Sequence, residues 1–301
     1  MKKIFLVVFI LVLMVSLSQA EDFPVKKQEE VQKNLKFTGS GKQKALKIDN
    51  IFGSIDLTGY IGTTVAVKAK KTIKAKSDVK AREAQKDVKL DIAVKEDRIE
   101  IIVDGPFRDE DGKIRWDHDL GYIVRYDFEI KVPFHTTLDV KTVNEGDVKV
   151  ADIKGDVRLR NVNGIIEAEN IAGDFSVKTV NRRVIINGVT GSGTAHTVNG
   201  KVKVNFDRNP ASDCSFKSIN GKLDITFRKG LSADFKLKTF NGDIYTDFPA
   251  AYLPAEPVKG ERKNGKFVYK SNRFQAIRIG TGGSEIKMDT LNGNIYITEA
   301  K

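Results

Sequence analysis

Residues 143–204 read VNEGDVKVADIKGDVRLRNVNGIIEAENIAGDFSVKTVNRRVIINGVTGSGTAHTVNGKVKV, and one short phrase recurs through this stretch. Each phrase begins with an apolar residue, usually has a glycine two places later, and continues with apolar residues at alternate positions. The spacing is nine residues after a first step that is one residue longer. A fixed period of this kind indicates stacked repeats. The leading apolar residues are Val143, Ile153, Val162, Ile171, Val180, Val189 and Val198.

Each nine-residue phrase predicts a short strand and a turn. Alternate apolar residues bury one face of a strand. We expect the glycines to turn the backbone with positive φ, and Arg182 stands at one position where glycine is expected. A unit this short cannot bury its apolar face alone, so the units must stack. The predicted fold is an all-β, parallel β-solenoid (a β-helix).

A second motif gives the length of a full coil. Thr or Ser, an apolar residue, Asn and usually Gly recur at twice the period of the phrase, which gives about 18–21 residues per coil. We expect these asparagines and the preceding hydroxyl residues to stack along one edge of successive coils and to hydrogen-bond there. The predicted corner ladder consists of Asn144, Asn163, Asn181, Asn199, Asn220, Asn241 and Asn292.

The first residues have the features of a secretory signal. Lys2 and Lys3 precede an apolar run over residues 4–15, and small residues surround a cleavage position after Ala20. A retained membrane anchor is the alternative, but it needs about 20 apolar residues. We therefore predict a signal peptide over residues 1–20, export to the periplasm, cell surface or medium, and no transmembrane anchor after cleavage. The polar residues 21–44 predict a flexible lead-in.

The rest of the chain divides into a cap region and the repeats. Residues 45–134 predict one early coil, a short helix over residues 77–87 and a hairpin over residues 88–103. The helix is expected to cover the exposed strand edge of the solenoid. Residues 135–301 predict the solenoid, with a long insertion at 247–285 that contains a hairpin formed by residues 267–270 and 274–279.

The chain of 301 residues has a formal net charge of +11. An exported protein has little access to nucleic acid, so we expect no nucleic-acid partner. A basic balance outside the cytoplasm favours an anionic polysaccharide, another cell-envelope polymer or a protein partner. Acidic residues are plentiful and interspersed, so ordinary solubility is the alternative explanation of the charge.

The strand before each Asn corner carries charges at two outward positions. An acidic or small polar residue recurs four places before the basic position, as Asp174 precedes Lys178. Parallel strands lie about 4.8 Å apart, so the basic residues would form one column of a charged face. A solvated face with weak ion pairs is the alternative. The predicted binding residues are Arg160, Lys178, His196, Lys217 and Lys238, after which the column ends at Asp289.

The sequence contains no recognisable catalytic motif. Cys214 is the single cysteine, and its register predicts a buried, inert thiol. The acidic loop around Asp109 and Asp117 could bind Ca²⁺, but its spacing matches no EF-hand and favours a solvated loop. The histidines lie in dissimilar contexts, so we predict no metal site, and we predict no cofactor.

The order of these motifs resembles the DUF4097 family of adhesin-like proteins. The segments similar to that family are residues 126–133, followed by 141–144, the recurring Val-Asn-Gly corners, residues 247–249, and 280–283 before Leu291-Asn292-Gly293. The resemblance covers roughly residues 45–300. It implies an exported, right-handed β-solenoid and transfers no catalytic residue.

These features favour an exported, non-enzymatic binding scaffold whose charged face holds a polymer or a partner protein. A polysaccharide lyase or hydrolase is a second hypothesis, because parallel β-helices also carry such enzymes, but it needs acid and base residues that converge in a groove. A purely structural component of the cell envelope is a third hypothesis.

Overall fold

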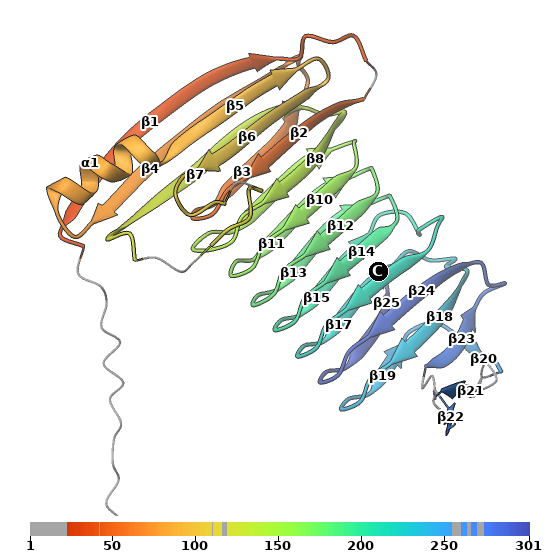
Figure 1. The fold of residues 1–301 in the computed structure, drawn as a ribbon. Coiled ribbons are helices and arrows are strands. Elements are labelled where there is room, and N and C mark those ends of the chain that lie inside the picture. Colours follow the sequence, from red (N-terminus) through yellow and green to blue (C-terminus); the bar gives the residue numbers. More distant parts are fainter. Residues whose placement is uncertain are drawn as a thin grey trace, which may run out of the picture.

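The computed structural model describes residues 23–41, 43–109, 111–115, 119–254, 260–263, 266–269 and 274–301. This part of the chain folds into strands and one helix, α1 (Asp78–Asp87). Two large sheets enclose a continuous apolar core, and their strands stack as rungs along the molecule (Figure 1). The predicted all-β class is confirmed. The predicted signal peptide lies outside the described residues, and no described helix is long and apolar enough to cross a membrane.

The first sheet has eleven strands, and its two outermost strands are β1 and β19. In spatial order its strands are β1 (Val25–Lys36), β4 (Thr64–Ala75), β7 (Tyr122–Pro133), β3 (Ile55–Tyr60), β9 (Val148–Ile153), β11 (Ile166–Ile171), β13 (Val184–Val189), β15 (Val202–Phe206), β17 (Leu223–Phe227), β25 (Ile295–Glu299) and β19 (Ile244–Thr246).

The second sheet has twelve strands. In spatial order they are β20 (Ala250–Tyr252), β23 (Gln275–Ile279), β18 (Ala233–Lys238), β24 (Ser284–Asp289), β16 (Cys214–Lys217), β14 (Gly193–His196), β12 (Phe175–Lys178), β10 (Val157–Arg160), β8 (Thr136–Lys141), β2 (Lys44–Asp49), β6 (Arg98–Asp104) and β5 (Lys89–Lys95). A separate pair is formed by β21 (Gly260–Lys263) and β22 (Lys266–Tyr269).

Each repeat coil contributes one strand to each sheet. From β8 to β17 the strands pair in parallel with the coils before and after, as β10 pairs with β8 and β12. Alternate residues point inward, so Leu159 stacks on Val140 and Val177 in the core. This register follows from the apolar alternation in the sequence, because a slip of one residue would turn every apolar side chain to solvent.

The corner glycines are needed for close approach and not for positive φ, which corrects the expectation from the sequence. Gly164, Gly200 and Gly221 are absent from the positive-φ residues. A Cβ at these positions would lie 1.9, 2.3 and 2.0 Å from a carbonyl oxygen of the neighbouring coil. The glycine therefore lets adjacent corners stack without a side chain between them.

The coils do not stack in sequence order at the C-terminal end. The last coil, β24 and β25, lies between the coil of β16 and β17 and the coil of β18 and β19. The sequence predicted successive stacking, which is wrong here because every Asn corner has the same form and carries no information on order. The predicted hairpin of residues 267–279 is also wrong, because β22 pairs with β21, whereas β23 pairs antiparallel with β18.

A similar exchange of order occurs in the cap region. The first coil in sequence, β2 and β3, lies between the strands β6 and β7 and the coil of β8 and β9. The predicted hairpin over residues 88–103 is present as β5 and β6. Ser77 caps α1, since its hydroxyl accepts a hydrogen bond from the Lys80 N–H at 3.3 Å.

Two expectations about the cap region are corrected. Residues 21–44 were expected to be flexible, but β1 pairs antiparallel with β4 along twelve residues. Only Val25, Val31 and Leu35 of β1 pack against the core, so its sequence lacks a clear strand pattern. The helix does not cover the strand edge: it contacts β1, β4 and β7, and β1 is the outermost strand (Figure 1).

Candidate functional site

Five basic side chains cross neighbouring strands of the twelve-stranded sheet in one register, and we call them the basic row. With about 4.8 Å between strands, the row extends over about 19 Å. Lys141 was missed in the sequence, although it precedes Asn144 by three residues as Lys178 precedes Asn181. The basic row consists of Lys141, Arg160, Lys178, His196 and Lys217, on β8, β10, β12, β14 and β16.

The predicted residue Lys238 stands apart from the basic row. Asp289 on β24 lies in register between Lys217 and Lys238, because the last coil is inserted there, and so it does not end the column. The Asp289 carboxylate is 3.9 Å from the Lys217 Nζ. The Nζ atoms of Lys238 and Lys287 lie 5.4 and 4.6 Å from the centre of the Phe274 ring, a cation–π arrangement.

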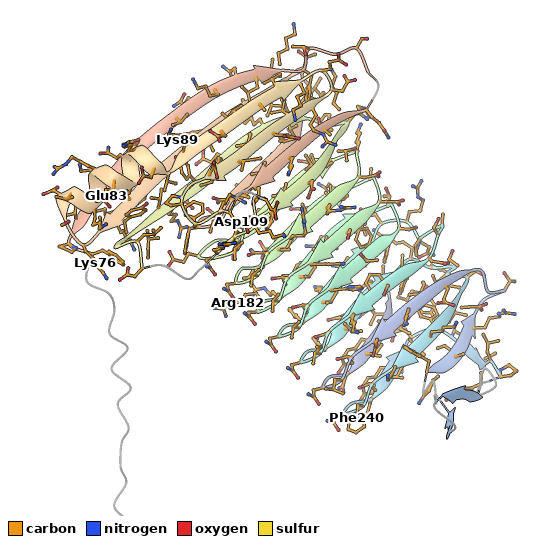
Figure 2. The ribbon with its side chains drawn as sticks, viewed as in Figure 1. Lys76, Glu83, Lys89, Asp109, Arg182 and Phe240 are labelled. Atoms are coloured by element: carbon orange, nitrogen blue, oxygen red, sulfur yellow. The ribbon has the colours of Figure 1, made fainter. Side chains whose placement is uncertain are left out.

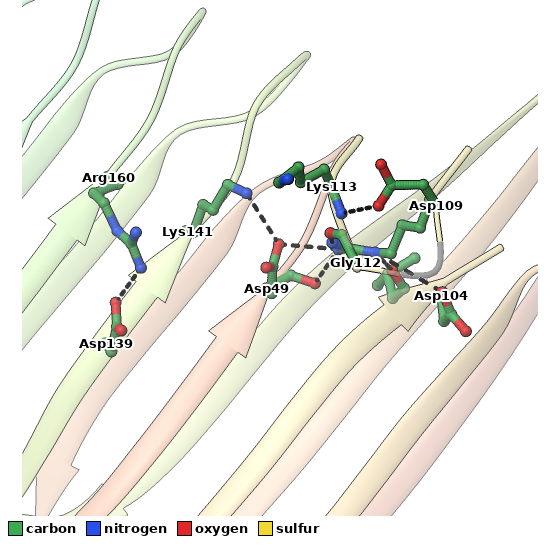
Figure 3. A network of polar contacts seen from close by, with 10 residues as sticks. Asp49, Asp104, Asp109, Gly112, Lys113, Asp139, Lys141 and Arg160 are labelled. Carbon is green, nitrogen blue, oxygen red and sulfur yellow. Dashed lines mark hydrogen bonds and ion pairs between the residues drawn. The ribbon is translucent and has the colours of Figure 1, made fainter. Parts of the chain in front are cut away.

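Acidic side chains neutralise the N-terminal part of the basic row (Figure 3). Asp139 holds Arg160 at 2.6 Å, and Asp49 lies 3.7 Å from the Lys141 Nζ. Asp49 is also 3.0 Å from Arg108, whose side chain is only 6% exposed and is therefore a structural link to the loop after β6. Lys178, in contrast, has no ion pair within the described part of the chain.

His196 lies between two permanently charged neighbours of the basic row. Burial lowers the pKa of His196 below its usual value, and the charges of Lys178 and Lys217 lower it further. Its Nε2 is 3.3 Å from the Ser215 hydroxyl oxygen on β16. His196 is therefore mainly neutral at pH 7, and it gains charge only in more acidic solution.

The acidic positions on the same face stabilise the backbone of the corners. Asp156 accepts a hydrogen bond from the Asp174 N–H at 2.9 Å, and Asp174 accepts one from the Ser192 N–H at 2.9 Å. Asp213 accepts one from the Glu285 N–H at 2.8 Å. One oxygen of each of these carboxylates is therefore already used to stabilise the neighbouring coil. The sequence pattern of charges does not reveal this commitment, because it depends on contacts between coils.

Small hydroxyl residues separate the acidic and basic positions. Ser176, Thr194 and Ser215 lie side by side on β12, β14 and β16, and the Thr194 hydroxyl donates to that of Ser176 at 3.4 Å. A shallow groove of about 410 Å³ is lined by Ser176 and by acidic residues such as Asp174. The face therefore combines cations, hydroxyls and carboxylates in parallel lines.

The corner asparagines form a continuous chain of hydrogen bonds along the edge next to the basic row. Each amide after Asn144 donates to the Oδ1 of the asparagine in the neighbouring coil, at 2.5–3.0 Å, and the inserted coil contributes to the chain. All the amides point the same way, so their dipoles reinforce one another. In spatial order the asparagines are Asn144, Asn163, Asn181, Asn199, Asn220, Asn292 and Asn241.

The hydroxyl residues before the asparagines bind the corners from inside. Thr179 donates to the Gly164 carbonyl at 3.0 Å, and Ser218 donates to the Gly200 carbonyl at 2.8 Å. Where this motif has Asn161 in place of a hydroxyl residue, the side-chain amide donates to the Gly146 carbonyl at 2.9 Å. These bonds satisfy corner carbonyls that water reaches poorly.

The groups considered for other chemistry are used differently. Cys214 is buried, and burial raises the pKa of its thiol to about 11. Asp109 accepts a hydrogen bond from the Lys113 N–H at 2.8 Å and so closes its own loop. Glu110, Asp117 and His118 lie outside the described residues. Among the residues that are described, no group of three or more His, Cys, Asp or Glu is placed to hold a metal ion.

Comparisons with known proteins add little. No family model and no curated protein match the chain. Two solved structures are similar over most of its length. One is a "putative cell adhesion protein" from Clostridium sporogenes, with 13% identity and a TM-score of 0.34; the match covers 91% of this chain and 100% of the other. The second is a "putative lipid binding protein" from Parabacteroides distasonis, with 10% identity and a TM-score of 0.31; the match covers 92% of this chain and 97% of the other. Likenesses this weak do not identify a ligand.

Proposed function

We propose that the chain is an exported, non-enzymatic binding scaffold that holds an anionic polysaccharide along the basic row. The observation that carries the proposal is the register of the basic row, which aligns four Lys or Arg side chains and His196 across five neighbouring strands. A linear polymer with one carboxylate per unit can contact several of them together. Such multivalent contacts add up even where each exposed pair is weak.

The neighbouring groups support this assignment. Hydroxyls beside the row suit hydrogen bonds to sugars. Asp156, Asp174 and Asp213 accept hydrogen bonds from backbone N–H groups of adjacent coils and so compete less for the cations. Glycosidic cleavage needs two carboxyl groups that flank one bond, whereas the aligned carboxylates of this face accept hydrogen bonds from backbone N–H groups. The signal-like N-terminal sequence supports export.

The test measures binding of polygalacturonate, with neutral dextran as the control polymer. We expect the triple variant Lys178→Glu, Lys217→Glu and Lys238→Glu, which changes two residues of the basic row and the predicted residue beyond Asp289, to bind at least tenfold more weakly. Binding by the native chain should also weaken with salt. The matched control is Lys33→Glu, Lys36→Glu and Lys89→Glu, which changes the net charge equally on the exposed faces of β1 and β5. Equal loss in both triples would leave only a net-charge effect, and release of reducing or unsaturated ends would overturn the non-enzymatic assignment.

A further inference from the structure

We infer that a second ligand site, for a saccharide unit that carries a carboxylate, lies in the groove on the other side of the asparagine ladder. This corner groove has a volume of about 750 Å³, which is within the range of small-molecule sites. It opens beside β3 and β9 of the eleven-stranded sheet, so it is distinct from the basic row on the other sheet. Its lining includes Asp56, Glu145, Lys149, Asn181, Arg182 and Arg183.

Arg182 is the residue that points to function. The equivalent corner positions Gly164, Gly200 and Gly221 have no room for a Cβ, which would meet a neighbouring carbonyl oxygen within 2.3 Å. Arg182 carries a side chain at this position of its own coil, at the edge where the sheets join (Figure 2). A residue that departs from the repeat pattern, and whose side chain makes no stabilising contact in exchange, is expected at a functional site.

The side chain of Arg182 makes no such stabilising contact among the described residues. Its backbone carbonyl accepts a hydrogen bond from Thr197 at 2.7 Å, as the corner glycines do for their neighbours. Its guanidinium group has no hydrogen bond or ion pair among the described residues. The guanidinium group of the adjacent Arg183 lies 3.8 Å from the Glu167 carboxylate, and both side chains are half-exposed. The guanidinium group of Arg182 is therefore free to bind a carboxylate through two parallel hydrogen bonds.

The other walls of the corner groove suit hydroxyl groups. Asp56 and Glu145 supply carboxylate acceptors, and Glu145 is held in the left-handed region at φ 53° in the one corner that is a residue longer. The Asn181 amide donates one N–H to Asn163, and its Oδ1 accepts one from Asn199, so its second N–H remains a donor. Carboxylates would repel a plain polyanion, but they accept hydrogen bonds from sugar hydroxyls. Together the groups fit an acidic sugar better than a bare anion.

The experiment titrates the full chain with a glucuronate disaccharide, and with inorganic phosphate as the bare anion, by calorimetry. Arg182→Gly restores the corner motif, and Arg182→Ala keeps the Cβ but removes the guanidinium group. We expect both variants to bind the disaccharide at least tenfold more weakly than the native chain, with no loss of melting temperature. Arg82→Ala, on the exposed face of α1, is the matched control and should bind like the native chain.

Three outcomes would overturn the inference: unchanged binding in both Arg182 variants, a lower melting temperature in both of them, or phosphate binding as tight as disaccharide binding. The first would remove Arg182 from the site, the second would give it a structural role, and the third would exclude a sugar site. The Lys178→Glu, Lys217→Glu and Lys238→Glu triple should bind the disaccharide normally. This arm separates failure of the corner groove from failure of the basic row.

Discussion

Gly164 lies where the backbones of two successive corners are in close contact. A Cβ there would be 1.9 Å from the Gly146 carbonyl oxygen and 2.3 Å from the Asn161 amide nitrogen. We expect Gly164→Ala to lower the free energy of unfolding by about 1–3 kcal/mol, because the backbones of both coils must shift. Urea unfolding gives the value. Lys229→Ala, in an exposed turn, should change it by less than about 0.5 kcal/mol, and equal stability of the two variants would contradict the close-approach explanation.

His196 gives a second prediction at this scale, on pH. Its pKa is lowered in the folded state by burial and by Lys178 and Lys217, so between the folded and unfolded pKa values the unfolded chain binds more protons. Its contribution to stability is therefore fully present above the unfolded value, about 6.5, and is lost as pH falls through the folded pKa.

We expect the native chain to lose more stability than His196→Gln when the pH falls from 7.5 to 5. The measurement is the free energy of unfolding of both proteins in urea at each pH. Lys178 and Lys217 on β12 and β16, with Ser215, are the polar groups that face His196. A difference between the proteins that stays constant with pH would show that His196 has the same pKa in both states.

At the residue scale the sequence predicted where particular residues lie better than it predicted what their contacts do. The asparagines and the alternating core residues were identified from their period. The role of Gly164 was not, because a steric contact between coils leaves no mark on local spacing. Lys141 was recoverable from its distance to Asn144, whereas the use of Asp174 by a backbone N–H depends on the neighbouring coil.

At the scale of elements, α1 depends on one buried lysine. Lys71 on β4 is 5% exposed, and its Nζ donates to the Val88 carbonyl at 2.8 Å and to the Gln85 carbonyl at 3.5 Å. The cation therefore binds the carbonyls at the C-terminal end of the helix, where the helix dipole is negative. Burial lowers the pKa of Lys71, and the charge of Glu29 opposes that shift.

We expect Lys71→Met to destabilise the protein by about 1.5–3 kcal/mol, the usual contribution of a hydrogen bond to a charged group. Amide hydrogen exchange over residues 78–87 should become faster, because the helix loses its attachment to β4. Lys70→Met, on the exposed face of the same strand, is the control. The role of Lys71 is wrong if helix exchange rises equally in both variants.

The elements that sequence reasoning identified are those with a local signal. The helix over residues 77–87 and the hairpin over residues 88–103 are visible in a short window of sequence. β1 was not identified, because the polar strand is held by its pairing with β4 rather than by an apolar face. A strand at the position of β23 was predicted, but its pairing with β18 was missed because the choice of partner leaves no local signal.

At the scale of the whole molecule, the order of the coils is open to a direct test. In a Cys214→Ser background, we expect Ser215→Cys with Lys287→Cys to form a disulfide under mild oxidation, since these residues pair on β16 and β24. Ser215→Cys with Lys236→Cys should not, because two rungs span about 9.6 Å and a disulfide needs Cα atoms within about 6.8 Å. Stacking in sequence order would reverse the two results, which mass spectrometry distinguishes.

The global architecture was predictable from the sequence, and the connectivity at its ends was not. A repeat period implies stacking whatever the order, because each coil buries its apolar face against any neighbour with the same register. Ile286 on β24 pairs with both Cys214 and Phe235, so either neighbour fits the same inward positions. Between the coil of β18 and β19 and the coil of β24 and β25, the chain passes through β23, which runs antiparallel to β18 and lies outside the repeats.

The interlaced ends make the middle of the stack the part whose length can vary. Between β9 and β16 each coil contacts only its neighbours along the chain, so an 18-residue duplication would add one coil and lengthen the stack by about 4.8 Å without altering either end. Duplication of a coil that carries Lys or Arg at this position would also extend the basic row by one cation. The number of copies of the repeat therefore sets the length of the stack and, if the proposed function holds, the length of polymer that the basic row contacts.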